Sequence, residues 1–335
     1  MSERHVGQRS FADDLVAGAA GSNAMLEQVN RLVDWSAVEV LLGGLRSGAM
    51  GAPAYPSLVL LKALLLQQWH ALSDPGLEDA LSDRLSFRRF IGLGLSEPVP
   101  DHSTVWRFRE QLATSGLAGQ AFALVTGQIE RSGFVLRQGT LIDASLVRSA
   151  VNPPPQPAAP LPPDADGRPA SKLVKSELDP DAGWTRKQNR RVFGYKVHVA
   201  MDQGSRIIRR AALTPANIND SVPADALICG DEKVIYADKA YDQNARRGRL
   251  KALGIRDGIM RRANKWHPMS RWAIRRNKVI SWRRAPIEPL FALLKRVYRF
   301  ARARYRGLAR NAAALHLALI AINLKRWVTA SPSTV

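Results

Sequence analysis

The chain has 335 residues, 46% of them hydrophobic, and a formal net charge of +20. This length is typical of about two domains with real cores, and the hydrophobic content excludes wholesale disorder. The single cysteine, Cys229, excludes an internal disulfide framework and zinc sites built from paired cysteines.

The excess of positive charge indicates a polyanionic partner, nucleic acid before an anionic membrane surface. The longest apolar runs, Leu58–Leu66 and Ala312–Ile322, are too short to span a membrane and contain Lys62 and His316. The segment Met1–Asp14 is polar and lacks the apolar core of a signal peptide. We therefore expect a cytoplasmic, nucleoid-associated protein with no membrane partner.

Residues 1–23 are expected to form a flexible terminus, and residues 24–135 a helical DNA-binding domain. Apolar residues at helical spacing predict about five helices there, with a turn at Asp74. Asp101 precedes one of these helices and is a candidate N-cap. The region 77–113 resembles a helix-turn-helix DNA reader, with Arg107 and Arg109 on its second helix as DNA contacts.

Near Gly139 the spacing of apolar residues changes from that of helices to that of strands, so we expect residues 136–330 to form a second domain. The Pro-rich stretch 150–170 cannot pack and is a linker or excursion. Strands are expected at 140–147, 195–201, 206–213, 233–238 and 256–262, with helices at 221–229, 244–253 and 311–327. This is a mixed α/β fold with a mixed five-stranded sheet.

One carboxylate, Glu288, lies in the most basic part of the chain. The segment Gln243–Arg310 contains 21 Lys and Arg and two acids, and carries +19 of the net charge. Apolar spacing after Ile287 predicts an amphipathic helix that begins near Glu288. Lys295 lies two turns later on the same face, and Arg284 precedes the helix. This arrangement suits phosphate chemistry; a surface row of ion pairs is the alternative.

Three acids occupy unusual positions. Asp143 lies within an apolar strand, Asp238 ends a strand, and Glu288 opens a buried helix. A charged side chain in a central strand is costly unless it is paired or metal-bound. Hard divalent cations prefer oxygen ligands, and two such ions assist phosphoryl transfer. The order of strands, helices and acids is that of a ribonuclease H-like fold.

The chain resembles bacterial insertion-sequence transposases of the Asp-Asp-Glu type, in the insertion-sequence-five group, over about residues 20–330. Several short pieces in one order carry the resemblance: Pro56–Lys62, Pro100–Thr104, Thr140–Asp143, Phe193–His198, Thr214–Asn217 with Asp220–Ser221, Ala237–Asp242, and Arg284 with Glu288 and Lys295. Two positions depart from the family pattern, where Ser281 replaces a frequent Tyr and Ala240 a frequent Gly.

The resemblance implies a DNA transposase that cleaves and joins strands at insertion-sequence ends. It implies that Asp143, Asp238 and Glu288 hold two Mg²⁺ ions, with Mn²⁺ as an alternative, and that Asp143 bridges them. Lys295 and Arg284 would hold phosphate at the catalytic site. The partners would be terminal inverted repeats, target DNA and a second subunit in a homodimeric complex. The alternatives are a metal-dependent nuclease without strand transfer and a non-catalytic DNA-binding regulator.

Further DNA contacts are expected from cations, one histidine and one tryptophan outside the triad. His198 and Lys196 share a strand face, although a strand-face histidine without a catalytic role is the alternative. The tryptophans near the basic segment alternate with cations, which suits base stacking, although packing in the core explains them equally well. The remaining expected contacts are Arg275, Arg276, Lys278, Trp282, Arg296 and Arg299.

Overall fold

The structure is a computed structural model that describes residues 4–8, 23–45, 54–153, 155, 176–187, 190–263 and 268–331. The chain divides into two compact units. The helical unit consists of residues 1–137, 202–209 and 312–335, and the sheet unit of residues 138–201 and 210–311. Most of the expected flexible terminus, 1–23, and of the Pro-rich excursion, 150–170, lies outside the described residues.

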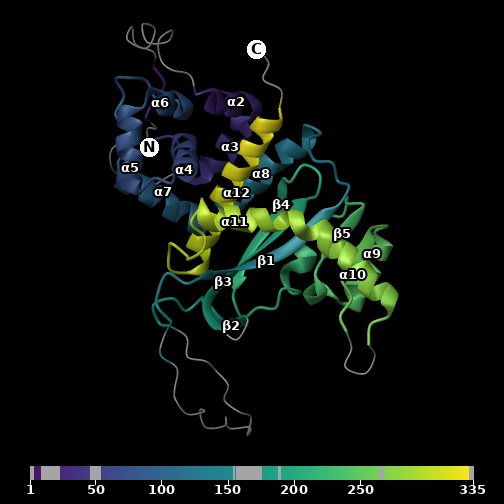
Figure 1. Ribbon diagram of the computed structural model, residues 1–335. Helices are drawn as coiled ribbons and strands as arrows, with labels where there is room; N and C mark the ends of the chain where they lie inside the picture. Colours follow the sequence, from purple (N-terminus) through teal and green to yellow (C-terminus); the bar gives the residue numbers. More distant parts are fainter. Residues whose placement is uncertain are drawn as a thin grey trace. The chain divides into compact units, whose positions relative to one another are not determined.

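The helical unit (Figure 1) is built from α2 (Ala24–Leu32), α3 (Trp35–Leu42), η1 (Gly43–Leu45), α4 (Ser57–His70), α5 (Asp74–Asp83), α6 (Leu85–Ile91), α7 (His102–Ser115), α8 (Leu117–Arg131) and most of α12 (Leu308–Ala330). The expected N-cap is confirmed, because Asp101 accepts a hydrogen bond from the Thr104 N–H at 2.6 Å. The turn expected at Asp74 is wrong. Ser73 caps α5 there, and Pro75 occupies its first turn, where proline is tolerated.

Segments distant in sequence complete the helical unit. The indole of Trp69 donates a 2.9 Å hydrogen bond to the carbonyl of Ala321 in α12. Asn323 of α12 is fully buried and bonds both backbone groups of Ile208. The unit therefore depends on residues beyond the 24–135 boundary expected for the helical domain.

The sheet unit contains β1 (Thr140–Arg148), β2 (Gly183–Lys187), β3 (Arg190–Asp202), β4 (Ile208–Pro215), β5 (Val234–Ala237) and β6 (Arg256–Ile259). Along the sheet the order is β2-β3-β1-β5-β6, and β4 also pairs with β3. Within the described residues the sheet thus has six strands, where the sequence predicted five. The additional strand is β2, which pairs antiparallel with β3.

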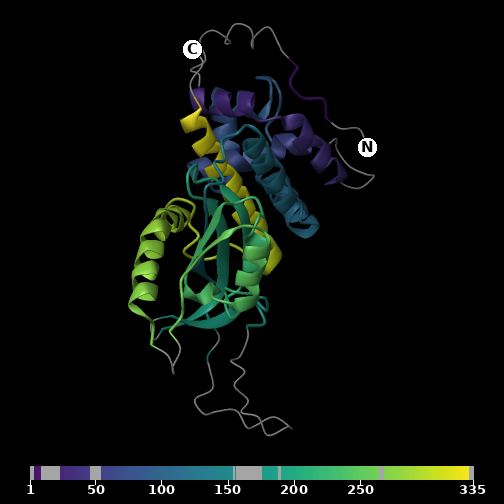
Figure 2. The ribbon, with the colours of Figure 1, turned by 90° about the vertical axis from the view of Figure 1, so that its right-hand side faces the viewer.

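Helices cover both faces of this sheet. Figure 2 shows α9 (Asn244–Ala252) and α10 (Arg271–Arg284) on opposite sides of it. The backbone continues from α10 through the 3-10 turn η4 (Ala285–Ile287) into α11 (Glu288–Arg296), so the helix predicted to begin near Glu288 is confirmed. The segment expected to be helical at 221–229 forms only the short η2 (Pro223–Leu227).

β1 and β3 approach each other closely at one glycine. Gly194 has φ +155°, and a Cβ there would lie 2.1 Å from the carbonyl oxygen of Val147. Any side chain at this position would therefore push the two strands apart. Close pairing here sets the position of β1, the strand that contains Asp143.

Candidate active site in the sheet unit

Asp143 and Asp238 lie level with each other on neighbouring parallel strands. β1 pairs with β5 in a register that joins Thr140 to Ile235 and Leu141 to Tyr236. Continuing this register by two residues brings Asp143 level with Asp238, which follows the last residue of β5. The predicted places of these acids, one within a strand and one at a strand end, are confirmed.

Asp143 is held by an arginine. Its Oδ2 lies 3.0 Å from Nη2 of Arg284, and its Oδ1 accepts a 2.9 Å hydrogen bond from the Ala144 N–H. Burial raises the pKa of Asp143 above its ordinary value, as do the charges of Asp238 and Asp220, whereas Arg284 lowers it. The carboxylate is thus largely withdrawn from water, and its charge is stabilised by a cation.

Asp238 and Glu288 sit at the beginnings of helical turns. Asp238 caps η3 (Lys239–Tyr241), where its Oδ1 accepts a 2.7 Å hydrogen bond from the Ala240 N–H. Glu288 is exposed, and it directly follows η4, which packs against β1. Glu288 and Arg284 therefore lie at the two ends of the same short turn, η4.

The three carboxylates do not form a tight cluster by themselves. Among the described residues, Cys229, Asp231 and Glu232 are the group with ligand atoms all within 4.8 Å of one another. In that group the Glu232 carboxylate already accepts hydrogen bonds from the N–H groups of Cys229 and Gly230, and Arg210 donates to the Cys229 sulfur. That cluster is therefore explained as a capped turn.

A fourth carboxylate, Asp220, lies in the electrostatic environment of Asp143. Asp220 raises the pKa of both Asp143 and Tyr241. It pairs with Lys196 of β3 at 2.8 Å, and the same ammonium donates to the carbonyl of Ile218. The sequence pieces named above include Asp220, but nothing in its local pattern indicates that the loop after β4 returns to β1.

Two buried polar atoms beside these acids have no hydrogen-bond partner within the described part of the chain. They are the hydroxyl of Tyr241 and Nε of Arg284. The charges of Asp143, Asp238 and Arg284 all act on Tyr241, and the charge of Arg284 also acts on Asp143. A hydrated divalent cation prefers carboxylate and water oxygens as ligands, and unused hydrogen-bond donors beside such carboxylates are suited to holding them in position. The residues present therefore fit the metal that the sequence implies.

The expected DNA contacts divide into exposed and internal side chains. On α10, Arg275, Lys278 and Trp282 are exposed, and Trp282 is 70% exposed. Arg276 instead donates to the carbonyls of Ile259 and Asp257 at 2.7 and 2.6 Å. Its guanidinium is used to hold α10 against β6.

Two more expected DNA contacts point inward. Arg109 is buried and forms an ion pair with Asp74 at 2.7 Å, whereas Arg107 on the same helix is exposed. His198 is fully buried, its Nε2 lies 2.9 Å from the hydroxyl of Thr214, and burial lowers its pKa to about 4. This geometry gives Arg109 and His198 structural positions.

The cations of α11 and the turn after it remain available. Lys295 is partly buried, has no hydrogen-bond or ion-pair partner among the residues described, and has a pKa lowered by burial and by the charge of Lys187. Arg296 and Arg299 are exposed. A cation that has no acidic partner in the described part of the chain is suited to binding a phosphate.

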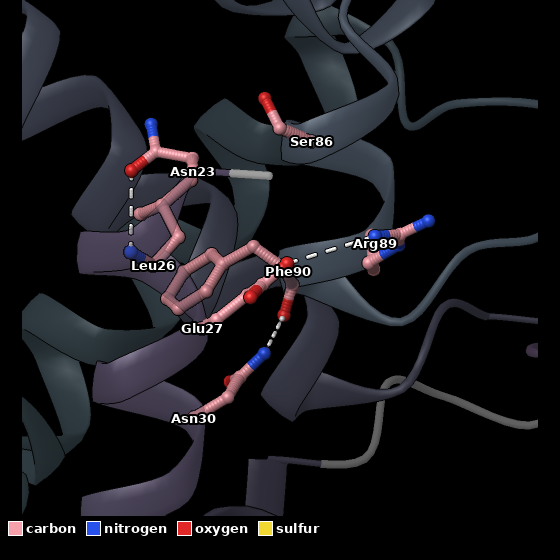
Figure 3. Close-up of a pocket in the computed structure, with 7 residues that line it drawn as sticks. All are labelled: Asn23, Leu26, Glu27, Asn30, Ser86, Arg89 and Phe90. Carbon is pink, nitrogen blue, oxygen red and sulfur yellow. Dashed lines mark hydrogen bonds and ion pairs between the residues drawn. The ribbon is translucent and has the colours of Figure 1, made fainter. Parts of the chain in front are cut away.

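The helical unit contains a small pocket between α2 and α6 (Figure 3). Its two charged residues, Glu27 and Arg89, pair with each other at 3.6 Å, and Asn30 donates to the carbonyl of Phe90. The charged groups of the pocket therefore pair with each other and indicate no catalytic chemistry.

Across the residues that the structure describes, no helix is long and apolar enough to cross a membrane. Residues 136–324 match a family model described as "Transposase DDE domain", and residues 16–111 match one described as "Transposase domain (DUF772)". No solved structure matches the chain significantly.

Proposed function

The chain belongs to the family of transposases with a DDE domain, and we propose that it cleaves and joins DNA strands at the ends of its own insertion sequence. Membership makes it a DNA-binding transposase that depends on a divalent metal, and its mixed α/β sheet unit is consistent with a ribonuclease H-like fold. The parallel register that sets Asp143 level with Asp238 is the observation that carries the proposal. The insertion-sequence-five group is the subgroup we propose.

Asp143, Asp238 and Glu288 would hold the metal, Mg²⁺ or alternatively Mn²⁺, and we propose two ions. When bound, such ions activate a nucleophilic oxygen and stabilise the leaving oxygen of the phosphodiester. Arg284 and Lys295 would offset the charge of the reacting phosphate. Lys196 keeps Asp220 paired, so that this additional carboxylate does not repel the phosphate.

The proposed reaction has two steps. In the first, a water oxygen bonds to phosphorus at the element end and the bond to the 3′ oxygen breaks, which leaves a 3′-hydroxyl and a 5′-phosphate. In the second, this 3′-hydroxyl attacks a target phosphodiester, and the target strand releases its own 3′-hydroxyl. Neither step needs an oxidant or reductant.

DNA would be bound by both units. We propose that the helical unit reads the terminal inverted repeats through Arg107, and that the exposed cations of α10 and α11 follow the DNA backbone. Lys196 is paired with Asp220, so it would have to change partner in order to contact DNA. A homodimer in the DNA complex would hold the two element ends together.

The test uses the full chain with duplex DNA that contains an element end, a target plasmid and Mg²⁺. We expect Asp143→Asn and Asp238→Asn to abolish cleavage and joining while DNA affinity stays within about twofold, because catalysis is lost but the cationic surface is not. Asp231→Asn, at an exposed acid of the capped turn, is the matched control and should remain active.

The outcomes separate the candidate functions. Cleavage without joining would support a nuclease of the same fold. If the wild type does not cleave DNA and both aspartate variants bind DNA as the wild type does, the protein would be a regulator.

A further inference from the structure

The hydroxyl of Tyr241 is a buried donor without an acceptor. Tyr241 is 1% exposed, and its Oη has no hydrogen-bond partner in the part of the chain that the structure describes. Its ring belongs to the apolar cluster that also contains Ile142, Leu227 and Ile259. Buried tyrosine hydroxyls usually find a partner, because an unsatisfied one loses its bonds to water without compensation. The position therefore needs an explanation beyond packing.

The surroundings of this hydroxyl are acidic. Burial raises the pKa of Tyr241 above its ordinary value, and so do the charges of Asp143, Asp220 and Asp238, whereas Arg284 lowers it. A tyrosine hydroxyl can donate one hydrogen bond. The carboxylates that act on this hydroxyl, and that could accept such a bond, are those of Asp143, Asp220 and Asp238.

The backbone of Tyr241 is fixed on two sides. Its N–H donates to the carbonyl of Asp238 at 3.2 Å, within η3. Its carbonyl accepts a 2.7 Å hydrogen bond from Arg246, which is 2% exposed and also bonds the carbonyl of Ser221, the residue after Asp220. Arg246 thus ties the Asp220 loop to the Asp238 turn, and the hydroxyl cannot move far to find another acceptor.

In this structure the carboxylates of Asp143 and Asp238 bond donors other than the Tyr241 hydroxyl. Oδ2 of Asp143 lies 3.0 Å from Arg284, and Oδ1 of Asp238 accepts from the Ala240 N–H. A divalent cation held by these acids would compete with Arg284 for Asp143, and the carboxylate oxygens available to a hydroxyl donor would then differ. Metal-ligating carboxylates are themselves held by hydrogen bonds from neighbouring groups.

We propose that Tyr241 is a positioning residue for the metal site, whose hydroxyl donates to a carboxylate of the Asp143–Asp238 pair when a divalent cation is bound. This inference rests on the proposed function, in which these two aspartates are the metal ligands. The rival explanation is an apolar core residue with an incidental hydroxyl. The two explanations predict different effects on metal affinity when the hydroxyl oxygen of Tyr241 is removed.

The experiment compares Tyr241→Phe with wild type in the full chain, with MnCl₂ as the only added ligand. Melting temperature is measured in EDTA and then across a Mn²⁺ titration. In EDTA we expect Tyr241→Phe to melt at or above the wild-type temperature, because an unsatisfied buried group is removed. We expect its Mn²⁺ midpoint to rise by roughly 10- to 100-fold, the usual effect of losing a bond that orients a ligand.

Tyr195→Phe is the matched control. Tyr195 is equally buried, but its hydroxyl donates to the buried Asp179, and burial also raises its pKa. Its loss should lower the melting temperature in EDTA and leave the Mn²⁺ midpoint unchanged. The control thus separates a structural hydroxyl from a positioning one.

Two results would overturn the inference: a wild-type Mn²⁺ midpoint in Tyr241→Phe, or a lower melting temperature in EDTA, which would mean that the hydroxyl is already bonded in the fold. Asp143→Asn in the same titration tests the proposed function separately. If Asp143→Asn loses the Mn²⁺ response and Tyr241→Phe keeps it, only the inference about Tyr241 fails. If Asp143→Asn responds like wild type, the proposed metal site itself fails.

Discussion

Arg284 and Asp143 form an ion pair at 3.0 Å, with their side chains 14% and 25% exposed. Asp143 lies in the middle of β1, and Arg284 is the last residue of α10, 141 positions later in the chain. The pair places a fixed cation at the acid that we propose as the shared metal ligand. Arg284 therefore both stabilises the buried charge of Asp143 and competes with a metal ion for it.

Removing Arg284 should strengthen metal binding and weaken catalysis. We expect Arg284→Gln to lower the Mn²⁺ midpoint, measured by thermal shift without DNA, by roughly tenfold, or about 1.4 kcal/mol of relieved repulsion. Strand cleavage should fall, because the same side chain is proposed to hold phosphate. Weaker Mn²⁺ binding in this variant would instead mean that Arg284 orients Asp143 for the metal.

Lys295 should contribute to turnover more than to affinity. It is partly buried, and within the described chain it has no acidic partner. We expect Lys295→Ala to reduce strand cleavage on the order of 100-fold, the scale of losing one donor to a reacting oxyanion, with DNA affinity nearly unchanged. Arg296→Ala, next to it and exposed, is the control for a general loss of charge. If Lys295→Ala cleaves and joins DNA at the normal rate, Lys295 is a solvated charge on the helix surface with no catalytic role.

The exposed cations of α10 should supply affinity that does not depend on sequence. We expect Arg275→Ala with Lys278→Ala to weaken binding to element ends and random duplex alike. The slope of log affinity against log salt should fall by about 0.9 for each lost phosphate contact. Fluorescence anisotropy over a salt series measures both quantities.

Arg276 provides the contrast on the same helix. Because its guanidinium bonds the carbonyls of Ile259 and Asp257, Arg276→Ala should destabilise the fold and leave the salt slope alone. A reduced salt slope in a stably folded Arg276→Ala protein would contradict this assignment.

Arg107 and Arg109 should behave oppositely, although they are two residues apart. Arg107→Ala should reduce the preference for element-end DNA over random DNA and leave stability unchanged. Arg109→Ala removes the ion pair with the partly buried Asp74, so we expect a loss of roughly 3 kcal/mol in the free energy of unfolding. Competition binding and urea unfolding of the full chain give the two readouts. Equal DNA preference in wild type and Arg107→Ala would place sequence reading elsewhere.

His198 should make the protein sensitive to acid. Burial lowers the pKa of His198 from its ordinary 6.5 to about 4, so below pH 6.5 the unfolded chain binds a proton that the folded chain does not. Stability attributable to His198 is therefore intact above pH 6.5 and is lost as the pH falls towards 4, by roughly 3 kcal/mol in total. Urea unfolding of wild type and His198→Gln is measured between pH 7.5 and 4.5. As the pH falls, the free energy of unfolding of the wild type should decrease relative to that of the variant. Parallel pH curves would contradict the assignment.

Much of the local structure is predictable from the sequence. Apolar runs that end in or contain an acid identified β1 and β5, and capping chemistry located the start of α7 at Asp101. In the sheet unit, one strand and one long helix were not predicted. β2 is short and exposed towards its end, and α10 buries only Ala273, Asn277 and Ile280 among many cations, so neither has a strong apolar pattern.

By itself the sequence determined the family motifs, the positive charge and the elements that carry Asp143, Asp238 and Glu288. Only the tertiary structure decided where the charged side chains point. Arg109 and Arg276 bond acids or carbonyls inside the protein, whereas Arg107 and Arg275 are exposed, and the loop after β4 returns Asp220 to the surroundings of Asp143. The reason is physical: apolar periodicity reports burial along one element, whereas the partner of a charge is supplied by another element, often more than thirty residues away.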